Sequence, residues 1–272
     1  MIPTPPIPSQ MPPPPWSSWE KWLQSSPGRY VLGWEQRCFD QIVADVFGFH
    51  AVQIGLPQIN TLSENRMPLH AILMHANDNP AYASHYHWRL IEGGPAELPF
   101  GNDTLDLIVL PHVLEFAADP HQILREVDRV LRPEGRLIIS GFNPASLWGA
   151  RQYLSRLIGS PYLPRDGQFI GLLRIKDWLK LLNFSLDRGH FGCYKFPLQS
   201  ESAMRKMEFL EKMGNRWWPI FGAVFLVSAI KRQQGIRLIG PASLARIPAL
   251  KPLSPAAERA HIQKPIQRIN RM

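Results

Sequence analysis

Polar residues directly follow two apolar stretches of this chain, and their types suit chemistry. His112 comes after the apolar run Leu105 to Leu110, and Asn143 follows the run Arg136 to Ser140. A histidine at such a point can act as a general base or contact a ligand, and an asparagine amide can bind a substrate. Ligands bind at the carboxyl ends of parallel strands, so Pro111, His112 and Asn143 mark the edge where we expect a site.

The stretch between these motifs predicts one strand–helix–strand unit of a parallel sheet. Both runs are apolar enough to be covered on both faces. We expect the helix to begin at Asp119 and Pro120, which are typical N-cap and first-turn residues. A tight turn at Pro133-Glu134-Gly135 is predicted to lead into the second strand. Asp106, Glu115 and Asp119 are interpreted as structural residues.

Further elements are predicted on both sides of this unit from the spacing of their apolar residues. They are helices at 16–23 and 34–47, the second ended by Gly48, strands at 50–55, 70–74 and 87–91, an insertion at 144–183, and strands at 184–196 and 221–231. The aromatic insertion would form a lid over the substrate, with membrane-facing aromatic residues or ordinary packing as the alternatives.

Four motifs stand in fixed order in the middle of the chain. They are Leu98-Pro99-Phe100, Leu105-Asp106-Leu107-Ile108-Val109, His112-Val113-Leu114-Glu115 and Leu131-Arg132-Pro133-Glu134-Gly135-Arg136-Leu137. Together they resemble the central block of class I S-adenosylmethionine (SAM)-dependent methyltransferases, specifically the type 11 group. The resemblance is strong over the middle third of the chain. It implies an α/β, Rossmann-like three-layer sandwich, with a mostly parallel seven-stranded sheet and an antiparallel terminal strand, and SAM as cofactor.

The cofactor loop departs from the family pattern. The family has an acid and then a glycine-rich loop after its first strand, whereas this chain has Gln53, keeps Gly55 and carries Pro57 and Ile59 at the later glycine positions. The acids that the family uses for the ribose and the adenine are also replaced, by His75 and by Gly94. The resemblance then implies that the cofactor contacts come from Gly55, Leu56, His75, Pro95, Ala96, Pro111 and His112.

Substrate contacts are predicted from Tyr30, Asn143 and Trp148. Tyr30 is expected ahead of the first core helix, where a segment can cross the mouth of the site, and Trp148 belongs to the aromatic insertion. The alternatives are an Asn-Pro turn for Asn143 and a turn-forming role for His112. Trp217-Trp218-Pro219 is interpreted as hairpin core, with contact to a membrane or an acyl substrate as the alternative.

Composition predicts one substantial domain over residues 16–232. The chain has 272 residues, 45% of them hydrophobic, and its two cysteines suit a reducing cytosol and show no metal-ligand spacing. The proline-rich residues 1–15 have no signal-peptide pattern, and we expect them to be disordered in a cytoplasmic protein. Residues 233–272 are predicted to be a basic, proline-containing disordered tail. This tail would contact RNA or an anionic membrane without specificity, or act only as a solubilising extension.

Two functions compete on this evidence. The first is SAM-dependent methyl transfer to a small molecule, which needs positioning of the reactants rather than a fixed catalytic triad. The second is a noncatalytic interaction module for protein or nucleic acid that has kept the fold and lost the cofactor, as the altered loop at Gly55 suggests. A dinucleotide-dependent dehydrogenase is a distant third alternative, because no G-x-G-x-x-G motif is present in the first strand–loop–helix region.

Overall fold

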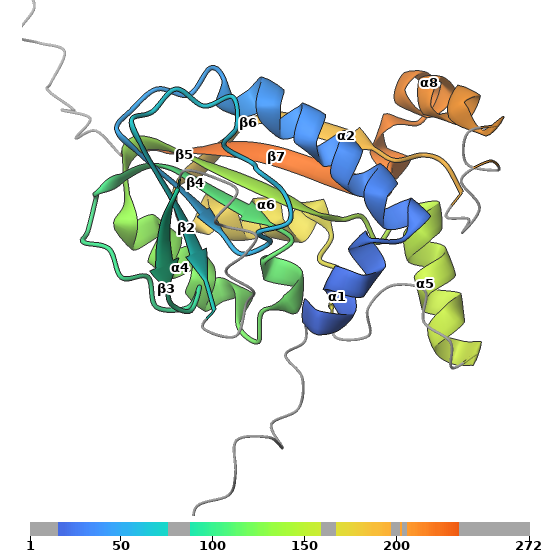
Figure 1. Ribbon diagram of the computed structural model, residues 1–272, viewed down its shortest axis with the longest axis horizontal. Coiled ribbons are helices and arrows are strands. Elements are labelled where there is room, and N and C mark those ends of the chain that lie inside the picture. Colours follow the sequence, from blue (N-terminus) through green and yellow to red (C-terminus); the bar gives the residue numbers. More distant parts are fainter. Residues whose placement is uncertain (1–15, 76–87, 159–166, 197–201, 203–205, 234–272) are drawn as a thin grey trace, which may run out of the picture. The chain divides into compact units, whose positions relative to one another are not determined.

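The computed structural model describes residues 16–75, 88–158, 167–196, 202 and 206–233 (Figure 1). By its internal contacts the chain divides after Gln234 into a large unit and a short C-terminal one. Residues 1–15, and the predicted tail beyond Gln233, lie outside the described residues, as do parts of the predicted insertion.

A seven-stranded sheet forms the centre of the large unit, in the order β3-β2-β1-β4-β5-β7-β6. The first five strands pair in parallel, and β7 runs antiparallel to both of its neighbours. The predicted fold class is therefore confirmed. The strands are β1 (His50–Ile54), β2 (Leu69–Met74), β3 (Arg89–Glu92), β4 (Leu105–Pro111), β5 (Leu131–Phe142), β6 (Phe184–Gly192) and β7 (Val224–Lys231).

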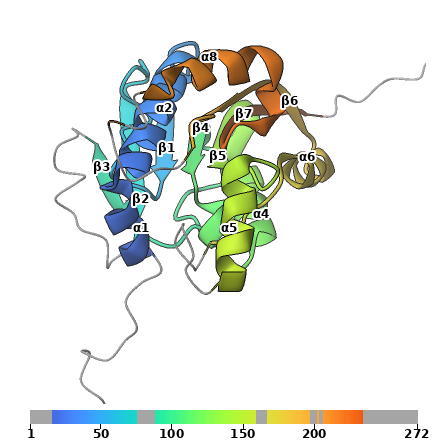
Figure 2. The same ribbon diagram turned by 90° about the vertical axis from the view of Figure 1, so that its right-hand side faces the viewer.

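Helices cover both faces of the sheet (Figure 2). One apolar cluster joins α1 and α2 to alternate residues of β4, such as Leu107 and Val109, and a second joins α4 and α6 to Ile108 and Leu110. Since side chains alternate along a strand, β4 is buried on both sides, as its composition predicts. The helices are α1 (Trp16–Leu23), α2 (Ser26–Val43), α4 (Pro120–Val130), α5 (Leu147–Ile158), α6 (Leu172–Leu181) and α8 (Glu208–Trp217), with short 3-10 helices η2 (Leu114–Phe116) and η3 (Pro219–Phe221).

Helix α2 begins eight residues earlier than the apolar pattern predicts. Ser25 is its N-cap and accepts a hydrogen bond from the backbone N–H of Gly28, while Pro27 lies in its first turn. Pro27 and Gly28 therefore start a helix instead of forming a loop. Tyr30 consequently lies within α2, and the prediction that it precedes the first core helix is wrong. At its other end α2 stops at Val43, before Gly48.

The predicted turn at Pro133 lies inside β5 instead of ahead of it. Leu131 already pairs with Leu105, and the register then shifts so that Arg136 pairs with Leu107. The residues between loop out as a bulge, in which Glu134 has a φ of +63°. The residues typical of a turn are thus present, but strand β5 continues on both sides of them.

The predicted insertion contains two helices of different kinds. Helix α6 covers the sheet through Ile175 and Leu179, which belong to its buried core. Helix α5 leaves Leu147 and Leu154 exposed, although Trp148 beside them is fully buried. Residues 159–166 between the helices are outside the described chain, so the interpretation of this segment as a lid stays a prediction.

Asp106 fixes the start of β1 to β4, as its structural interpretation predicts. Its carboxylate accepts the N–H groups of Phe49 and His50 at 2.8 and 3.0 Å, and a third hydrogen bond from Arg132 at 3.1 Å. Gly48 packs so closely here that a Cβ would lie 2.4 Å from the Asp106 side chain. Partial burial opposes ionisation of Asp106, but the two backbone hydrogen bonds and the Arg132 guanidinium hold its pKa below the usual value.

We expect Asp106→Asn to lower the free energy of unfolding at neutral pH by about 1–3 kcal/mol, because two backbone donors lose a charged acceptor. A lowered folded-state pKa stabilises the protein above the unfolded value of about 3.9, and this stabilisation is lost as pH falls through the folded value. Urea unfolding from neutral to acidic pH measures both effects, and the difference from wild type should shrink in acid. Asp103→Asn, at an exposed pair with Lys231, is the control and should change stability by less than about 1 kcal/mol.

Candidate functional site

A cavity opens at the carboxyl ends of β1, β2 and β4. Five residues predicted as cofactor contacts line it: Gly55, Leu56, His75, Pro95 and Pro111. The remaining wall is mostly apolar and comes from residues that were not predicted as cofactor contacts, namely Trp19, Ile54, Pro57, Gln58, Leu73, Gly93, Val113, Phe116 and Ala117. The predicted edge of the sheet therefore holds an enclosed space.

The loop after β1 is organised by the side chain of Gln53, which is completely buried. Its amide nitrogen lies 2.9–3.0 Å from the carbonyl oxygens of Gly55, Leu56 and Ile59, and donates to them. Its amide oxygen accepts the backbone N–H of Thr61 at 3.1 Å and the Thr61 hydroxyl at 2.7 Å. One side chain thus holds the backbone of the loop from both ends.

This loop is strained where it meets the cavity. Gly55 has a φ of +71°, and the next residue, Leu56, has a φ of +45°. A left-handed conformation costs a non-glycine residue roughly 1–2 kcal/mol, so the rest of the loop must impose it on Leu56. Residues 55–68, between β1 and β2, contain only turns and bends and no helix. The loop follows a path of its own, as the replacement of glycine by Pro57 predicts.

Gln58 presents an acceptor at the cavity that the sequence gave no reason to choose. Its side-chain oxygen is buried and has no hydrogen-bond partner among the described residues, although the residue lines the cavity. A buried acceptor without a partner is costly, and a ligand N–H or O–H group would satisfy it. Only the folded path of the loop reveals this residue.

His112 lies directly behind the cavity wall, between two glutamates. Its Nε2 is 3.0 Å from Glu35 Oε1 on α2, and its Nδ1 is 2.8 Å from Glu115 Oε2 on η2. All three side chains are buried, with exposures of 1%, 0% and 4%. Burial alone would lower the pKa of His112, but the charges and hydrogen bonds of the two glutamates raise it to about 10. The imidazole is therefore protonated at neutral pH and joins α2, β4 and η2.

Comparison with known proteins agrees with this architecture. Residues 69–139 match the family model of a methyltransferase domain. The solved structure of a SAM-dependent methyltransferase from Thermotoga maritima superposes with a TM-score of 0.56 at 14% sequence identity, covering 80% of this chain and 100% of that one. Residues 69–139 thus resemble a methyltransferase domain, and the fold of the chain is shared with solved methyltransferase structures.

Two curated relatives share shorter parts of the sequence. The uncharacterized protein YafS of Escherichia coli is 36% identical over 142 residues, which are 52% of this chain and 55% of YafS. A demethylmenaquinone methyltransferase of Mycobacterium tuberculosis is 36% identical over 76 residues, 28% of this chain and 32% of that enzyme. The chain therefore matches about half the length of these relatives or less.

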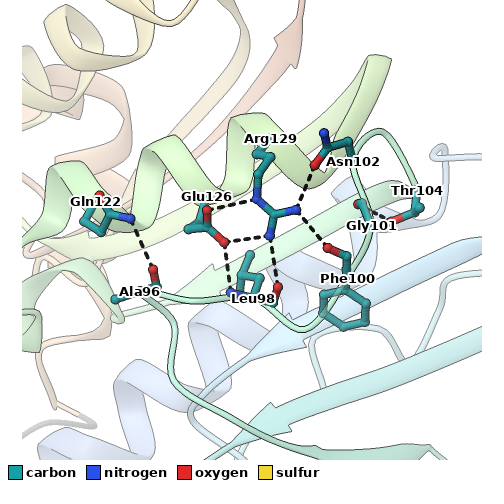
Figure 3. Close-up of polar contacts among 9 residues, drawn as sticks. All are labelled: Ala96, Leu98, Phe100, Gly101, Asn102, Thr104, Gln122, Glu126 and Arg129. Atoms are coloured by element: carbon teal, nitrogen blue, oxygen red, sulfur yellow. Dashed lines mark hydrogen bonds and ion pairs between the residues drawn. The ribbon is translucent and has the colours of Figure 1, made fainter.

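The segment before β4 is fixed to α4 by Arg129 (Figure 3). Its guanidinium donates to both oxygens of Glu126 and to the carbonyl oxygens of Leu98 and Phe100, over 2.7–3.0 Å. Glu126 in turn accepts the N–H of Leu98 at 3.0 Å. Arg129 and Glu126 thus hold the Leu98-Pro99-Phe100 motif in place, and the motif positions the neighbouring cavity wall at Pro95.

Two residues predicted to contact the cofactor do not line this cavity. Ala96 directs its carbonyl oxygen to the side-chain amide of Gln122, at 3.4 Å (Figure 3). His112 is separated from the cavity by its neighbours Pro111 and Val113, which do line it. Ala96 and His112 would contribute to cofactor binding by positioning the residues beside them.

The three predicted substrate residues lie outside this cavity. The side-chain nitrogen of Asn143 donates to the carbonyl oxygens of Ile220 and Gly222 at 2.7 and 3.0 Å, so its amide fixes the start of β7. The indole of Trp148 is buried and donates to the carbonyl oxygen of Lys195 at 2.7 Å. The hydroxyl of Tyr30 donates to Glu211 on α8, and burial is the first cause of its strongly raised pKa.

Neither a metal site nor a membrane-spanning segment is found in the described part of the chain. No group of three or more His, Cys, Asp or Glu side chains is placed to hold a metal ion in the described ranges. Within the same ranges, no helix combines the length and apolar character needed to cross a bilayer.

Proposed function

We propose that this chain is a SAM-dependent methyltransferase and that it binds SAM in the cavity at the carboxyl ends of β1, β2 and β4. The observation that carries the proposal is the cavity itself, with the strained loop at Gly55 and Leu56 forming one wall. Strain of this kind persists where the surrounding structure over-determines it, and it is concentrated at binding sites.

The residues present fit such a cofactor. The unpartnered oxygen of Gln58 would accept from the α-ammonium group or a ribose hydroxyl. His75 stands near the ribose position, and the apolar side chains of Leu73 and Val113 suit the adenine ring. Bound SAM supplies an electrophilic methyl group on a sulfonium centre. The protein's part is to orient the acceptor in line and to exclude water, for which Trp19 and Phe116 offer apolar cover at the cavity.

The acceptor proposed is a small apolar molecule. Aromatic side chains gather beside the cavity, where Trp19 lies 5.3 Å from Phe116 and 5.6 Å from Phe142, measured between ring centroids. Such a surface favours a planar or apolar group. The relative whose name specifies demethylmenaquinone as its substrate agrees with this class of acceptor.

A noncatalytic interaction module is the second candidate, and one observation favours it. Since the loop from Gly55 leads into turns, no helix N-terminus from this loop faces the cavity, and one common device for binding an anionic ligand group is missing. A module that had lost its cofactor would keep the sheet and the hydrogen bonds of Arg129 without binding SAM.

Calorimetric titration with SAM and with S-adenosylhomocysteine separates the two candidates, after mass spectrometry has shown that neither copurifies. We expect wild type to bind with a micromolar Kd and Gly55→Val to lose binding, because a β-branched residue does not tolerate a φ of +71°. The control is Gly94→Ala, since a Cβ there would meet nothing within 4 Å. Absence of binding by folded, cofactor-free wild type at millimolar ligand would leave the interaction module.

A further inference from the structure

Helix α8 displays an apolar stripe that faces away from the protein. Phe209, Met213 and Trp217 follow one another at intervals of four residues, which places them on one side of a helix. Their exposures are 56%, 40% and 67%. A different side of α8 packs inward, where Gly214 lies so close to Tyr194 that a Cβ would be 2.2 Å from its ring. The helix is therefore fixed with its apolar stripe outward.

The apolar surface extends beyond α8. Trp218, Ile220 and Phe221 in and before η3 are all more than half exposed, which contradicts the interpretation of the Trp217-Trp218-Pro219 segment as hairpin core. Leu147 and Leu154 of α5 are exposed at the same end of the molecule (Figures 1 and 2). A groove joins the two elements, lined by Leu147 and Trp148 on one side and by Leu210, Trp218 and Phe221 on the other.

Exposed cations border this apolar face. Among the described residues 206–217, Lys206, Lys212 and Arg216 are exposed, against a single exposed acid, Glu208. The other acid of the helix, Glu211, is occupied by the Tyr30 hydroxyl and by the backbone N–H groups of Cys193 and Tyr194. The border therefore carries a net positive charge.

We propose that this face, made of α8, η3 and the exposed side of α5, docks onto the surface of an anionic lipid bilayer. Exposed aromatic and aliphatic side chains bordered by Lys and Arg are the features of helices that lie in the membrane interface, where tryptophan is enriched. A second copy of the chain fits less well, because a symmetric dimer through this face would bring two positive borders together. Docking does not depend on methyl transfer, and it is tested independently of SAM binding.

Vesicle cosedimentation of the full chain tests the proposal. We expect binding to vesicles of phosphatidylcholine with about 30 mol % phosphatidylglycerol and much weaker binding to phosphatidylcholine alone, because the charged border needs anionic lipid. The double variant Phe209→Gln/Trp217→Gln should bind about tenfold more weakly, because it loses two of the side chains that enter the interface. The matched control is Leu173→Gln/Leu181→Gln on α6, which removes two equally exposed apolar side chains elsewhere and should bind like wild type.

Three results would overturn the proposal. One is no binding of wild type to either vesicle. Another is anionic-vesicle binding that survives in the α8 double variant, which would assign the interaction to charge elsewhere, such as the basic residues beyond Gln233. The third is a wild-type dimer in light scattering that the α8 double variant abolishes, without vesicle binding. Circular dichroism and calorimetry with SAM on the same variants separate loss of docking from loss of folding or of the cofactor site.

Discussion

The Gln53→Glu variant is expected to have a free energy of unfolding about 3 kcal/mol or more below that of wild type, although the substitution only replaces the side-chain NH2 group with an oxygen. Gln53 donates to three carbonyl oxygens within a fully buried site. A glutamate would face those oxygens with a second acceptor and a buried negative charge, and it would have no cation beside it. We also expect SAM binding to be lost, because Gly55 and Leu56 would no longer be held in their left-handed conformations.

Urea unfolding and calorimetry measure these two effects, and Gln41→Glu, at an exposed position of α2, is the matched control. The same substitution at Gln41 places the carboxylate at the protein surface, where it stays hydrated. It should therefore change stability by less than about 1 kcal/mol. Equal stability of the two variants would contradict the assignment of Gln53 as the organiser of the loop.

His112→Gln is expected to destabilise the fold by about 3–5 kcal/mol, because it leaves two buried carboxylates without the cation between them. Glu35 comes from α2 and Glu115 from η2, so the loss should loosen the contact of the N-terminal helices with the edge of the cavity. His121→Gln, at an exposed position of α4, is the control for the loss of an imidazole.

The pH dependence of stability identifies His112 more specifically than its removal does. A folded-state pKa raised to about 10 gives a stabilisation that is complete below the unfolded value of about 6.5 and is lost as pH rises through 10. Wild type should therefore lose stability between neutral and alkaline pH, and His112→Gln should lack this component. In the double variant Glu35→Gln/His112→Gln part of the stability should return. If the free energies of unfolding of wild type and His112→Gln changed with pH in parallel, His112 would not be the buried cation inferred here.

The fold was predictable because the signals that define it are local. The run Leu105 to Leu110 and the N-cap pair Asp119 and Pro120 appear at the positions where β4 and α4 are found. Parallel strands that are covered on both faces are apolar throughout, so their sequences need no tertiary context to be recognised. The bulge at Pro133 and the early start of α2 were misjudged for the opposite reason. Proline and glycine serve turns, bulges and first helical turns alike, and only the packed neighbours decide among them.

The site was predictable only in its location. The strand ends predicted Gly55, His75 and Pro111 at one edge of the sheet, and the cavity lies there. Partners that are distant in sequence were not predictable. Glu35 meets His112 across 77 positions of the chain, and nothing near either residue indicates the pair. Gln53 was recognised as a missing acid, whereas its role as a donor to the loop depends on the folded path of that loop.

The position of β7 sets the order in which the sheet can be completed. This strand is the last of the described strands along the chain, yet it lies between β5 and β6, and β6 pairs with no other strand of the described sheet. During synthesis β1 to β5 can assemble as they emerge, but β6 waits and the edge of β5 stays open until Val224 to Lys231 arrives. An open strand edge is a template for pairing with another chain. Slow translation or truncation just before Val224 would thus prolong the stage at which this protein is most prone to aggregate.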